Sequence, residues 1–463
     1  MLTLIVFYLV VCSCNLINCF HDSDLTKKSV SSNHALVQQP LIDPLYKDDD
    51  EAENKAKIND VELENWVKLQ VDRSWSALLN NISPRGALPG LVVASLSTYE
   101  PDYFYTWTRD TAIILREVVT RYEETNDSNL LRLIKQSIST TKVIQNYDRK
   151  YSSVGLGEPK NYVNGYPFTK PWGRPQMDGP GLRAILYIKF ANIYLQRGGY
   201  EAKEYIRDVL YDGRANSRSV IKADLEYISN NWNGLSFDLW EEVKGHHFFT
   251  LIVIQSALKD GVKISKTLND PGATSYYKLQ SELIEDKLKL FWNQKLGYIR
   301  ATVNYTANNG KTTWLDMGTI LGSLLSGERA SAEFRPNSTK IVSTYKAFLA
   351  SMNDLYPINQ RYHNITAKPV GRYPEDIYDG VSTSQGNPWF ISIFGLSEFL
   401  FRNKEKKVSE QFLRIGRNYI KPNGSIHEQI HRSLGIGIGA RDLTWSHYSF
   451  LAMNRARTGK PEF

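Results

Sequence analysis

Six tryptophans of this chain stand in similar polar loops, and each loop comes shortly before an apolar stretch. The loops recur at intervals of about 55 to 75 residues, which indicates one supersecondary unit copied along the chain. Four other tryptophans lie off the pattern, so the shared context of the six carries more weight than their spacing. The six are Trp107, Trp172, Trp240, Trp314, Trp389 and Trp445.

The segments between these loops show helical rather than alternating periodicity. Leu130, Ile134 and Ile138, for example, recur at the spacing of one helix face. Between adjacent loops there is room for about two helices of ordinary length. Six helical hairpins closed into a ring would bring all six loops to one end, around one pocket. We therefore predict an all-α fold, an (α/α)6 barrel.

The chain divides into three parts by composition. Residues 1–20 are predicted to be a signal peptide, because an apolar run is followed by small residues; a retained anchor is the alternative. Residues 21–60 are polar and aperiodic and are predicted to form a leader or disordered arm. No linker divides the remainder, so residues 61–463 are predicted to form a single domain.

Cysteines and glycosylation sequons both suggest passage through a secretory route. Cys12, Cys14 and Cys19 are the only cysteines and lie in or beside the predicted signal, so no internal disulfide is expected. Asn-X-Ser/Thr sequons occur at Asn81, Asn126, Asn304, Asn337, Asn364 and Asn423. We expect a secreted monomer without membrane attachment after signal cleavage; a vacuole or another secretory compartment is the alternative destination.

Charge argues against nucleic acid as a partner. The net charge is +7, the charges are interspersed, and the one basic cluster at 404–407 is short. A nucleic-acid footprint needs a concentrated basic face. The sequence also lacks a compact set of His and Cys side chains of the kind that binds a metal ion.

The segment 237–249 carries the most telling chemistry. It sets Asp238, Glu241 and Glu242 around Trp240 just before an apolar run. A carboxylic acid held against an indole loses hydration of its charged form, so its pKa rises and it can donate a proton near neutrality. An indole is also a platform for the C–H face of a sugar ring, so the pattern suggests glycoside chemistry. The alternative is a solvated acidic helix start.

Hydrolysis of an acetal needs a second carboxylate besides the acid. Glu428 follows a glycine-containing turn shortly before the last apolar stretch, and the predicted ring would bring it from the far side of the pocket toward Glu241. Asp238 is a rival partner. Because Asp238 shares a short segment with Glu241, we expect it to orient and tune the acid instead.

Other loops combine an aromatic residue, an arginine and a carboxylate, a set that can grip neighbouring sugar hydroxyls. Each could also be an ordinary helix-entry loop, and Asp110 could cap a helix that starts at Thr111. The residues concerned are Tyr103, Trp107, Arg109 and Asp110 in the first loop, Trp172, Arg174 and Asp178 in the second, and Arg372 and Trp389 in a later one.

Taken together, DYFYTWTRD, GLGEP, WGRPQxDGPxLRA, DLWEEVxGxHFFT, GRYPEDxYxG, GNPW, GSxxEQ and LTWS resemble the fungal and yeast glucoamylase family, in the family's order, from about residue 61 to 457. The resemblance implies an (α/α)6 barrel that releases glucose from the non-reducing ends of α-1,4-glucans with inversion to the β-anomer, and that cleaves α-1,6 links more slowly. Met177 and Gly181 depart from the family's usual polar residue and alanine. The resemblance also implies that neither a metal nor an organic cofactor is needed, and a starch-binding domain is not expected.

The resemblance also implies residue roles. Glu241 matches the general acid and Glu428 the base that activates water, whereas Asp238 belongs to the signature with an open role. The subsite for the terminal glucose would comprise Tyr103, Trp107, Arg109, Asp110 and Arg372. Supporting contacts would come from Trp172, Arg174, Trp240, Glu242 and Trp389, with Trp445 beside the base.

Two alternatives stay open. One is a non-catalytic glucan-binding protein on a degenerate barrel, although such a protein would have lost an acid or base and both are present here. The other is a related toroidal glycosidase that prefers α-1,6 links or trehalose.

Overall fold

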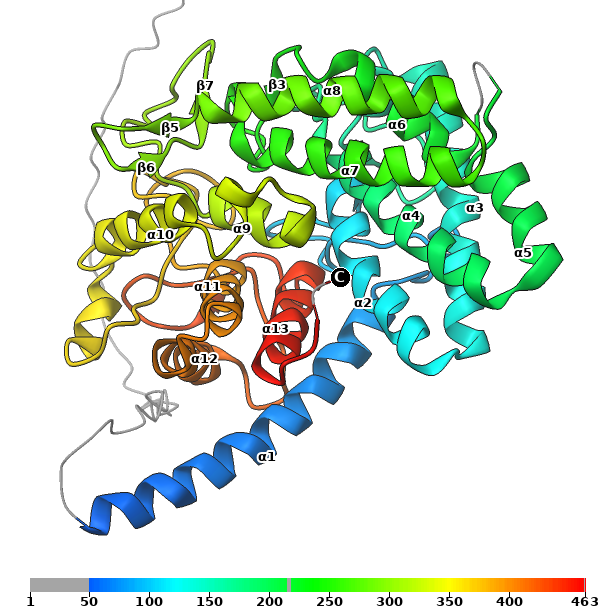
Figure 1. Ribbon diagram of the computed structural model, residues 1–463. Helices are drawn as coiled ribbons and strands as arrows, with labels where there is room; N and C mark the ends of the chain where they lie inside the picture. Colours follow the sequence, from blue (N-terminus) through cyan, green and yellow to red (C-terminus); the bar gives the residue numbers. More distant parts are fainter. Residues whose placement is uncertain (1–49, 215–217, 462) are drawn as a thin grey trace, which may run out of the picture. The chain divides into compact units, whose positions relative to one another are not determined.

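Six helices form an inner ring in the part of the chain that the computed structural model describes, residues 50–214, 218–461 and 463, with side chains from Asp60 onward (Figure 1). Each inner helix packs against the next, and the last packs against the first, which closes the ring. In ring order they are α2 (Thr108–Thr125), α4 (Asp178–Arg197), α7 (Phe248–Thr267), α9 (Met317–Ser326), α11 (Phe390–Arg402) and α13 (Thr444–Arg457).

A second layer of six helices covers the ring, and each of them contacts at least one inner helix. This two-layer arrangement confirms the predicted (α/α)6 barrel. The outer helices of the described chain are α1 (Asp50–Asn80), α3 (Ser128–Tyr151), α6 (Val220–Asn231), α8 (Pro271–Lys289), α10 (Thr339–Met352) and α12 (Lys406–Tyr419). The short α5 (Gly199–Tyr205) and a π-helical turn (Ile206–Leu210) are inserted between α4 and α6.

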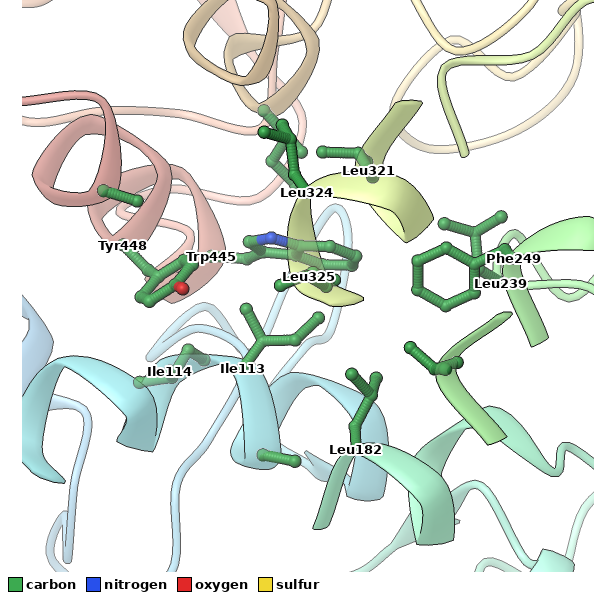
Figure 2. Packing of buried hydrophobic residues seen from close by; sticks show 14 of the residues in the cluster. Ile113, Ile114, Leu182, Leu239, Phe249, Leu321, Leu324, Leu325, Trp445 and Tyr448 are labelled. Carbon is green, nitrogen blue, oxygen red and sulfur yellow. The ribbon is translucent and has the colours of Figure 1, made fainter. Parts of the chain in front are cut away.

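The inner helices are apolar on more than one face, because they face both the ring's interior and the outer layer. Every residue of α9 is buried. Figure 2 shows Trp445 of α13 reaching in among Ile113 of α2 and Leu324 and Leu325 of α9. Each such buried aliphatic side chain contributes about 1.5–3 kcal/mol. The interior of the barrel is thus a packed core.

The helices begin directly after the tryptophan loops, as predicted. Trp107 and Trp389 are the residues just before α2 and α11, and Trp445 is the second residue of α13. Asp110 is not the cap that we considered, because α2 starts at Thr108 and Asp110 lies in its first turn. The pairing of Trp107 with Lys160 holds Trp107 extended, so the helix starts immediately after it.

Short strands among the loops are a feature that the all-α prediction lacks. Segments of two to four residues are too short to show an alternating pattern. The antiparallel pairs are β1 (Thr106–Trp107) with β2 (Lys160–Asn161), β4 (Lys244–His247) with both β3 (Ser236–Phe237) and β7 (Thr302–Val303), β5 (Trp292–Asn293) with β6 (Tyr298–Ile299), and β8 (Gln429–Ile430) with β9 (Gly437–Ile438).

The N-terminal boundary differs from the expected one. Helix α1 begins at Asp50, so the last part of the expected disordered arm, 50–60, is helical. Its composition explains this, since Glu, Ala and Lys are good helix formers. The predicted signal peptide and the rest of the arm lie outside the described residues. All described residues belong to one compact unit, and no helix among them is long and apolar enough to cross a membrane.

Candidate active site

A cavity of about 680 Å³ opens among the loops that lead into the inner helices. Five of the six loop tryptophans line it, which agrees with the predicted convergence of the loops on one pocket. Trp314 is the exception, because its ring packs against Tyr305 instead. The predicted site residues that line the cavity are Tyr103, Trp107, Arg109, Asp110, Trp172, Trp240, Glu241, Glu242, Arg372, Trp389, Glu428 and Trp445.

Glu241 is held by donors from two neighbouring loops. Its Oε1 accepts hydrogen bonds from Trp107 Nε1 at 2.9 Å and Gln176 Nε2 at 3.0 Å. Arg109 lies 3.7 Å from the same oxygen. The backbone of Glu241 is left-handed, with φ of +69°. Residues other than glycine disfavour this conformation. The surrounding loops therefore fix the direction of this carboxyl at some conformational cost.

Trp240 does not hold the Glu241 carboxyl, contrary to our expectation. Its indole N–H donates to Asp316, at 2.9 and 3.1 Å from the two carboxyl oxygens. Burial raises the pKa of Asp316 to about 6. The indole that contacts Glu241 is that of Trp107, which belongs to another loop. Adjacency in the sequence misled us here, because Glu241 and Trp240 point in different directions.

Glu428 is buried in the opposite wall. Its carboxyl accepts a hydrogen bond from Tyr103 and lies 3.4 Å from the backbone N–H of Ala440. Burial raises the pKa of Glu428 to about 8, while these two bonds and the charge of Arg372 lower it in part. The Tyr103 hydroxyl also lies 3.0 Å from that of Tyr378, so the base candidate is part of a hydrogen-bonded group.

Ring order places the two glutamates across the cavity from each other. Glu241 lies in the loop before α7, the third inner helix, and Glu428 lies in the loop before α13, the sixth. In a closed ring of six, the third and sixth positions face each other. Both glutamates line the same cavity.

Glu242 and Arg372 form a charged wall of the cavity. Arg372 donates to Glu242 at 2.7 Å and makes a two-pronged pair with Asp376 at 2.8 and 2.6 Å. The Tyr373 hydroxyl donates to the other oxygen of Glu242 at 2.6 Å. The guanidinium also lies over the ring of Trp389 at 5.1 Å. These contacts fix a planar set of donors and acceptors at the cavity surface.

Arg109 and Asp110 form a second polar wall. Arg109 donates to Gln176 at 2.8 Å and to Asp178 at 3.1 Å. Burial raises the pKa of Asp110 to about 6. Arg109 Nε and Asp110 Oδ2 lie 3.5 Å apart as an ion pair without a hydrogen bond, and in the described cavity wall Trp172 Nε1 and Trp389 Nε1 are buried without a hydrogen-bond partner in the protein. Such atoms suit hydroxyl groups of a ligand, since an unmade buried hydrogen bond is costly.

Arg174, predicted to be a substrate contact, does not line the cavity. Its Nε donates to both oxygens of Glu158, at 2.9 and 2.7 Å. The rest of the guanidinium donates to the backbone carbonyls of Phe168 and Lys170. Arg174 therefore ties together the loop that carries Trp172. The carboxylate that it needs, Glu158, lies in the GLGEP motif.

Asp238, predicted among the catalytic residues, lies behind the wall. One oxygen accepts the backbone N–H groups of Glu242 at 2.7 Å and Val243 at 2.8 Å. The other lies 3.3 Å from Lys311 Nζ. The pKa of Asp238 is lowered by Lys311 and these N–H bonds against the effect of burial. Asp238 thus holds the turn that presents Glu241 and Glu242.

Two buried lysines were missed by the sequence analysis. Lys311 lies 3.2 Å from Glu242 and 3.8 Å from Asp316, in addition to Asp238. Lys160 lines the cavity with its ammonium 3.8 Å from the centre of the Trp172 ring. Burial lowers the pKa of Lys160 to about 8, against the opposing charge of Glu241. The position of Lys160 directly after GLGEP was the available signal.

No group of three or more His, Cys, Asp or Glu side chains that could hold a metal ion occurs among the described residues. The residues that line the cavity offer carboxyl, guanidinium, ammonium, hydroxyl and indole groups.

Known proteins are similar to this chain in sequence and in fold. Glucoamylase 1 of Rhizopus oryzae is 32% identical, over 86% of this chain and 72% of its own length. The probable glucoamylase of Schizosaccharomyces pombe is 33% identical, over 84% of this chain and 90% of its own. The solved glucoamylase of Saccharomycopsis fibuligera superposes with a TM-score of 0.76 at 28% identity, covering 86% of this chain and 96% of its own.

The family model described as "Glycosyl hydrolases family 15" matches residues 72–407 and 401–455, which includes every loop that lines the cavity. Because this match covers most of its length, the chain belongs to glycosyl hydrolases family 15.

Proposed function

We propose that this chain is a glucan 1,4-α-glucosidase. It releases β-D-glucose from the non-reducing ends of starch, dextrins or glycogen by a single displacement, and cleaves α-1,6 links more slowly. Relatives that cover most of the chain are named glucoamylases. The observation that carries the proposal is the placement of Glu241 and Glu428 before the third and sixth helices of one ring, both lining one cavity.

Glu241 is proposed as the general acid. Both donors that contact its carboxyl, Trp107 and Gln176, act on Oε1. This leaves Oε2 to carry the proton. In the reaction Glu241 gives that proton to the glycosidic oxygen as the bond from this oxygen to the anomeric carbon breaks.

Glu428 is proposed as the general base. As a carboxylate it takes a proton from a water molecule whose oxygen bonds to the anomeric carbon from the other face of the sugar. Attack opposite to the departing oxygen inverts the anomeric configuration. Burial raises the pKa of Glu428 and so disfavours the ionised form that this step requires, and the Tyr103 hydrogen bond and the Arg372 charge offset that effect in part.

The walls supply a subsite for the terminal glucose. Arg109 and Asp110 on one side and Arg372 with Glu242 on the other offer fixed donors and acceptors to neighbouring hydroxyls. Trp445 lines the cavity, and Figure 2 shows the same side chain packed in the core among Ile113 of α2 and Leu324 and Leu325 of α9, so the cavity ends on packed core. A cavity with a packed floor admits the end of a chain, which supports exo action. Trp107, Trp172, Trp240 and Trp389 provide apolar surfaces for sugar rings.

Asp238 is proposed to position the acid and not to react. It holds the backbone of the 238–243 turn and is shielded from the cavity, so substrate would not touch it. Arg174 is proposed to support the Trp172 loop, because its guanidinium binds Glu158 and does not line the cavity.

The cellular setting is proposed from the sequence. Residues 1–20 would be a cleaved signal, and the domain that follows would be secreted, glycosylated and monomeric, without membrane attachment. Five of the six sequon asparagines are exposed, which supports glycosylation. Loss of residues 1–20 from the protein recovered from the culture medium would test the signal, and a molar mass in solution above that of one chain would contradict the monomer.

Proton NMR of the first product formed from maltotriose tests the function. The expected result is free glucose as the β-anomer, together with maltose. An α-anomer would contradict single displacement, and maltotriose left intact would overturn the function. Faster initial release of glucose from isomaltotriose or trehalose would instead identify a related toroidal glycosidase.

A further inference from the structure

Three tyrosine rings gather on the surface outside the cavity. Tyr166 stacks on Tyr147 with ring centres 4.3 Å apart and an interplanar angle of 24°. Tyr151 lies 5.4 Å from Tyr166 and 5.9 Å from Tyr147. Tyr151 is 50% exposed and Tyr166 is 41% exposed. Large aromatic side chains with this much exposure, grouped together, mark an interaction surface. We call these three residues the tyrosine cluster.

The tyrosine cluster joins the outer helix α3 to the loop that forms the cavity wall. Tyr147 and Tyr151 are one turn apart at the end of α3. Tyr166 belongs to a tight hairpin that starts at β2, closed by a hydrogen bond from the Tyr162 N–H to the Tyr166 carbonyl at 2.9 Å. Tyr166 follows Lys160 of the cavity wall by only six residues, a stretch that reaches at most about 22 Å when fully extended.

Aromatic rings continue along this hairpin toward the cavity. Tyr162 lies 5.8 Å from Tyr105 and 5.4 Å from Phe168. Phe168 in turn lies 5.5 Å from Trp172, which lines the cavity. The hairpin therefore carries rings on both sides, with Tyr166 outside and Tyr162 facing the cavity loops. This continuity links the tyrosine cluster to the active site.

A groove of about 580 Å³ runs along α3 and ends one helical turn before Tyr147 of the cluster. Val143, one turn before Tyr147, lines this groove. Its other side is formed by Leu88, whose backbone bonds to Val163 of the hairpin. Ser139, Gln136 and Arg132 add polar groups to its floor. The surface thus combines aromatic faces with hydroxyl, amide and guanidinium groups.

We propose that the tyrosine cluster, with the groove along α3, is a second binding site for α-glucan chains, separate from the site that cleaves them. The inference rests on the proposed function, which makes an α-glucan polymer the substrate. A pyranose ring has an apolar C–H face and a rim of hydroxyls, and it is matched by a tyrosine face with polar groups around it. A site that holds the body of the polymer would keep its chain ends near the cavity and raise their local concentration.

β-Cyclodextrin is a suitable probe, because it is a ring of α-1,4-linked glucose without a non-reducing end. Calorimetry would measure its binding to the full chain and to the double variant Tyr151→Ser with Tyr166→Ser. Loss of two stacking faces should weaken binding by at least tenfold, which corresponds to about 1.4 kcal/mol. Tyr151→Phe keeps the ring and should bind as the parent does. Tyr200→Ser, at an exposed tyrosine of α5, is the matched control.

Kinetics separate this site from the proposed function. In the double variant kcat/KM should fall several-fold on glycogen and stay at the parent value on maltose. If the parent releases no glucose from maltotriose but binds β-cyclodextrin through the cluster, the proposed function fails and the binding site stands. Equal β-cyclodextrin affinity in parent and double variant, or none in the parent, would overturn the site. So would a parent that self-associates through the cluster, since the surface would then be an interface between copies.

Discussion

Glu241 and Glu428 are surrounded by different kinds of neighbours, although both are glutamates of one cavity. Glu241 is about one-sixth exposed and receives two side-chain N–H groups. Glu428 is buried, next to a tyrosine hydroxyl and one backbone N–H. Environments that differ in this way can give two like carboxyls different roles.

Replacing either glutamate by glutamine should stop catalysis while sparing binding. Glu241→Gln cannot donate its proton and Glu428→Gln cannot accept one, so kcat should fall by about 10²–10⁴-fold in each. The shape of the side chain is kept, so the affinity for maltose should change little. Steady-state kinetics and calorimetry with maltose measure the two effects. Turnover within tenfold of the parent in either variant would remove that residue from its assigned role.

The pH profile should report the environment of Glu428. Burial raises the pKa of Glu428 to about 8, and the Tyr103 hydrogen bond lowers it. The base must be ionised, so kcat/KM should fall as the pH falls through this pKa. Tyr103→Phe removes the hydrogen bond, raises the pKa further and should shift this acid limb to higher pH. Tyr378→Phe, which removes the partner of Tyr103, is the control.

A shift of the acid limb to lower pH in Tyr103→Phe would contradict this account of Glu428. A lower kcat/KM with an unmoved limb would also contradict it, because Tyr103 would then act on substrate alone.

At the scale of residues, the sequence predicted which side chains meet at the cavity better than it predicted their partners. Tryptophan, arginine and carboxylate motifs identified most of the wall. Partners such as Trp107 for Glu241, or Lys311 for Asp238, come from loops far apart in the sequence. No local pattern encodes such a pair, so Arg174 was assigned to substrate when its guanidinium in fact binds Glu158.

At the scale of elements, the inner helices were predictable and their exact first residues were not. The apolar runs gave the inner helices, since the periodicity of a helix extends over many residues. The start of α2 at Thr108 depends on the pairing of Trp107 with Lys160, a contact between distant segments. The residue type of Asp110 and its place in the sequence suggested a helix N-cap. The helix instead starts two residues earlier, because of this tertiary contact.

Two helical glycines should respond to alanine in opposite directions. In α4, a methyl group on Gly181 would meet Ile254 at 3.4–3.6 Å, an ordinary contact. Gly181→Ala should therefore stabilise the fold by about 0.4–1 kcal/mol, by restricting the unfolded chain. In α12, a methyl group on Gly416 would lie 2.4 Å from the Phe394 ring. Gly416→Ala should destabilise by about 1–3 kcal/mol.

Thermal or urea unfolding of the two variants beside the parent measures both effects. Activity on maltose should be unchanged in Gly181→Ala. Destabilisation by Gly181→Ala would show that α4 and α7 pack more tightly than these contacts indicate.

At the scale of the whole described unit, the ring is closed by contacts between the two ends of the sequence. Helix α1 packs on α13, and α13 packs on α2. Asn81, which follows α1, donates from Nδ2 to Thr444 at 2.7 Å and to the Asp442 carbonyl at 3.1 Å. The repeat of loops predicted that a ring exists. The contacts that close it join residues more than 300 positions apart, so periodicity could not predict them.

The position of Asn81 at this closure should prevent its glycosylation. Asn81 is 1% exposed, and its side-chain nitrogen, the atom that would carry a glycan, is enclosed by its two acceptors at the start of α13. Asn126, Asn337, Asn364 and Asn423 are exposed and free of this constraint. In the active protein from a glycosylating host, we expect glycans at exposed sequons and none at Asn81. Mass spectrometry of peptides after enzymatic deglycosylation measures the occupancy of each site.

Substitution of Asn81 tests its role in stability independently of glycosylation. Asn81→Gln should lower the free energy of unfolding by about 1–3 kcal/mol, because the longer amide cannot make both hydrogen bonds in the same enclosed space. The same change at Asn423, which is exposed, should leave stability nearly unaltered in the unglycosylated protein. A glycan on Asn81 in folded, active protein would contradict the closure described here, since no bulky group fits between the end of α1 and the start of α13 while those bonds are made.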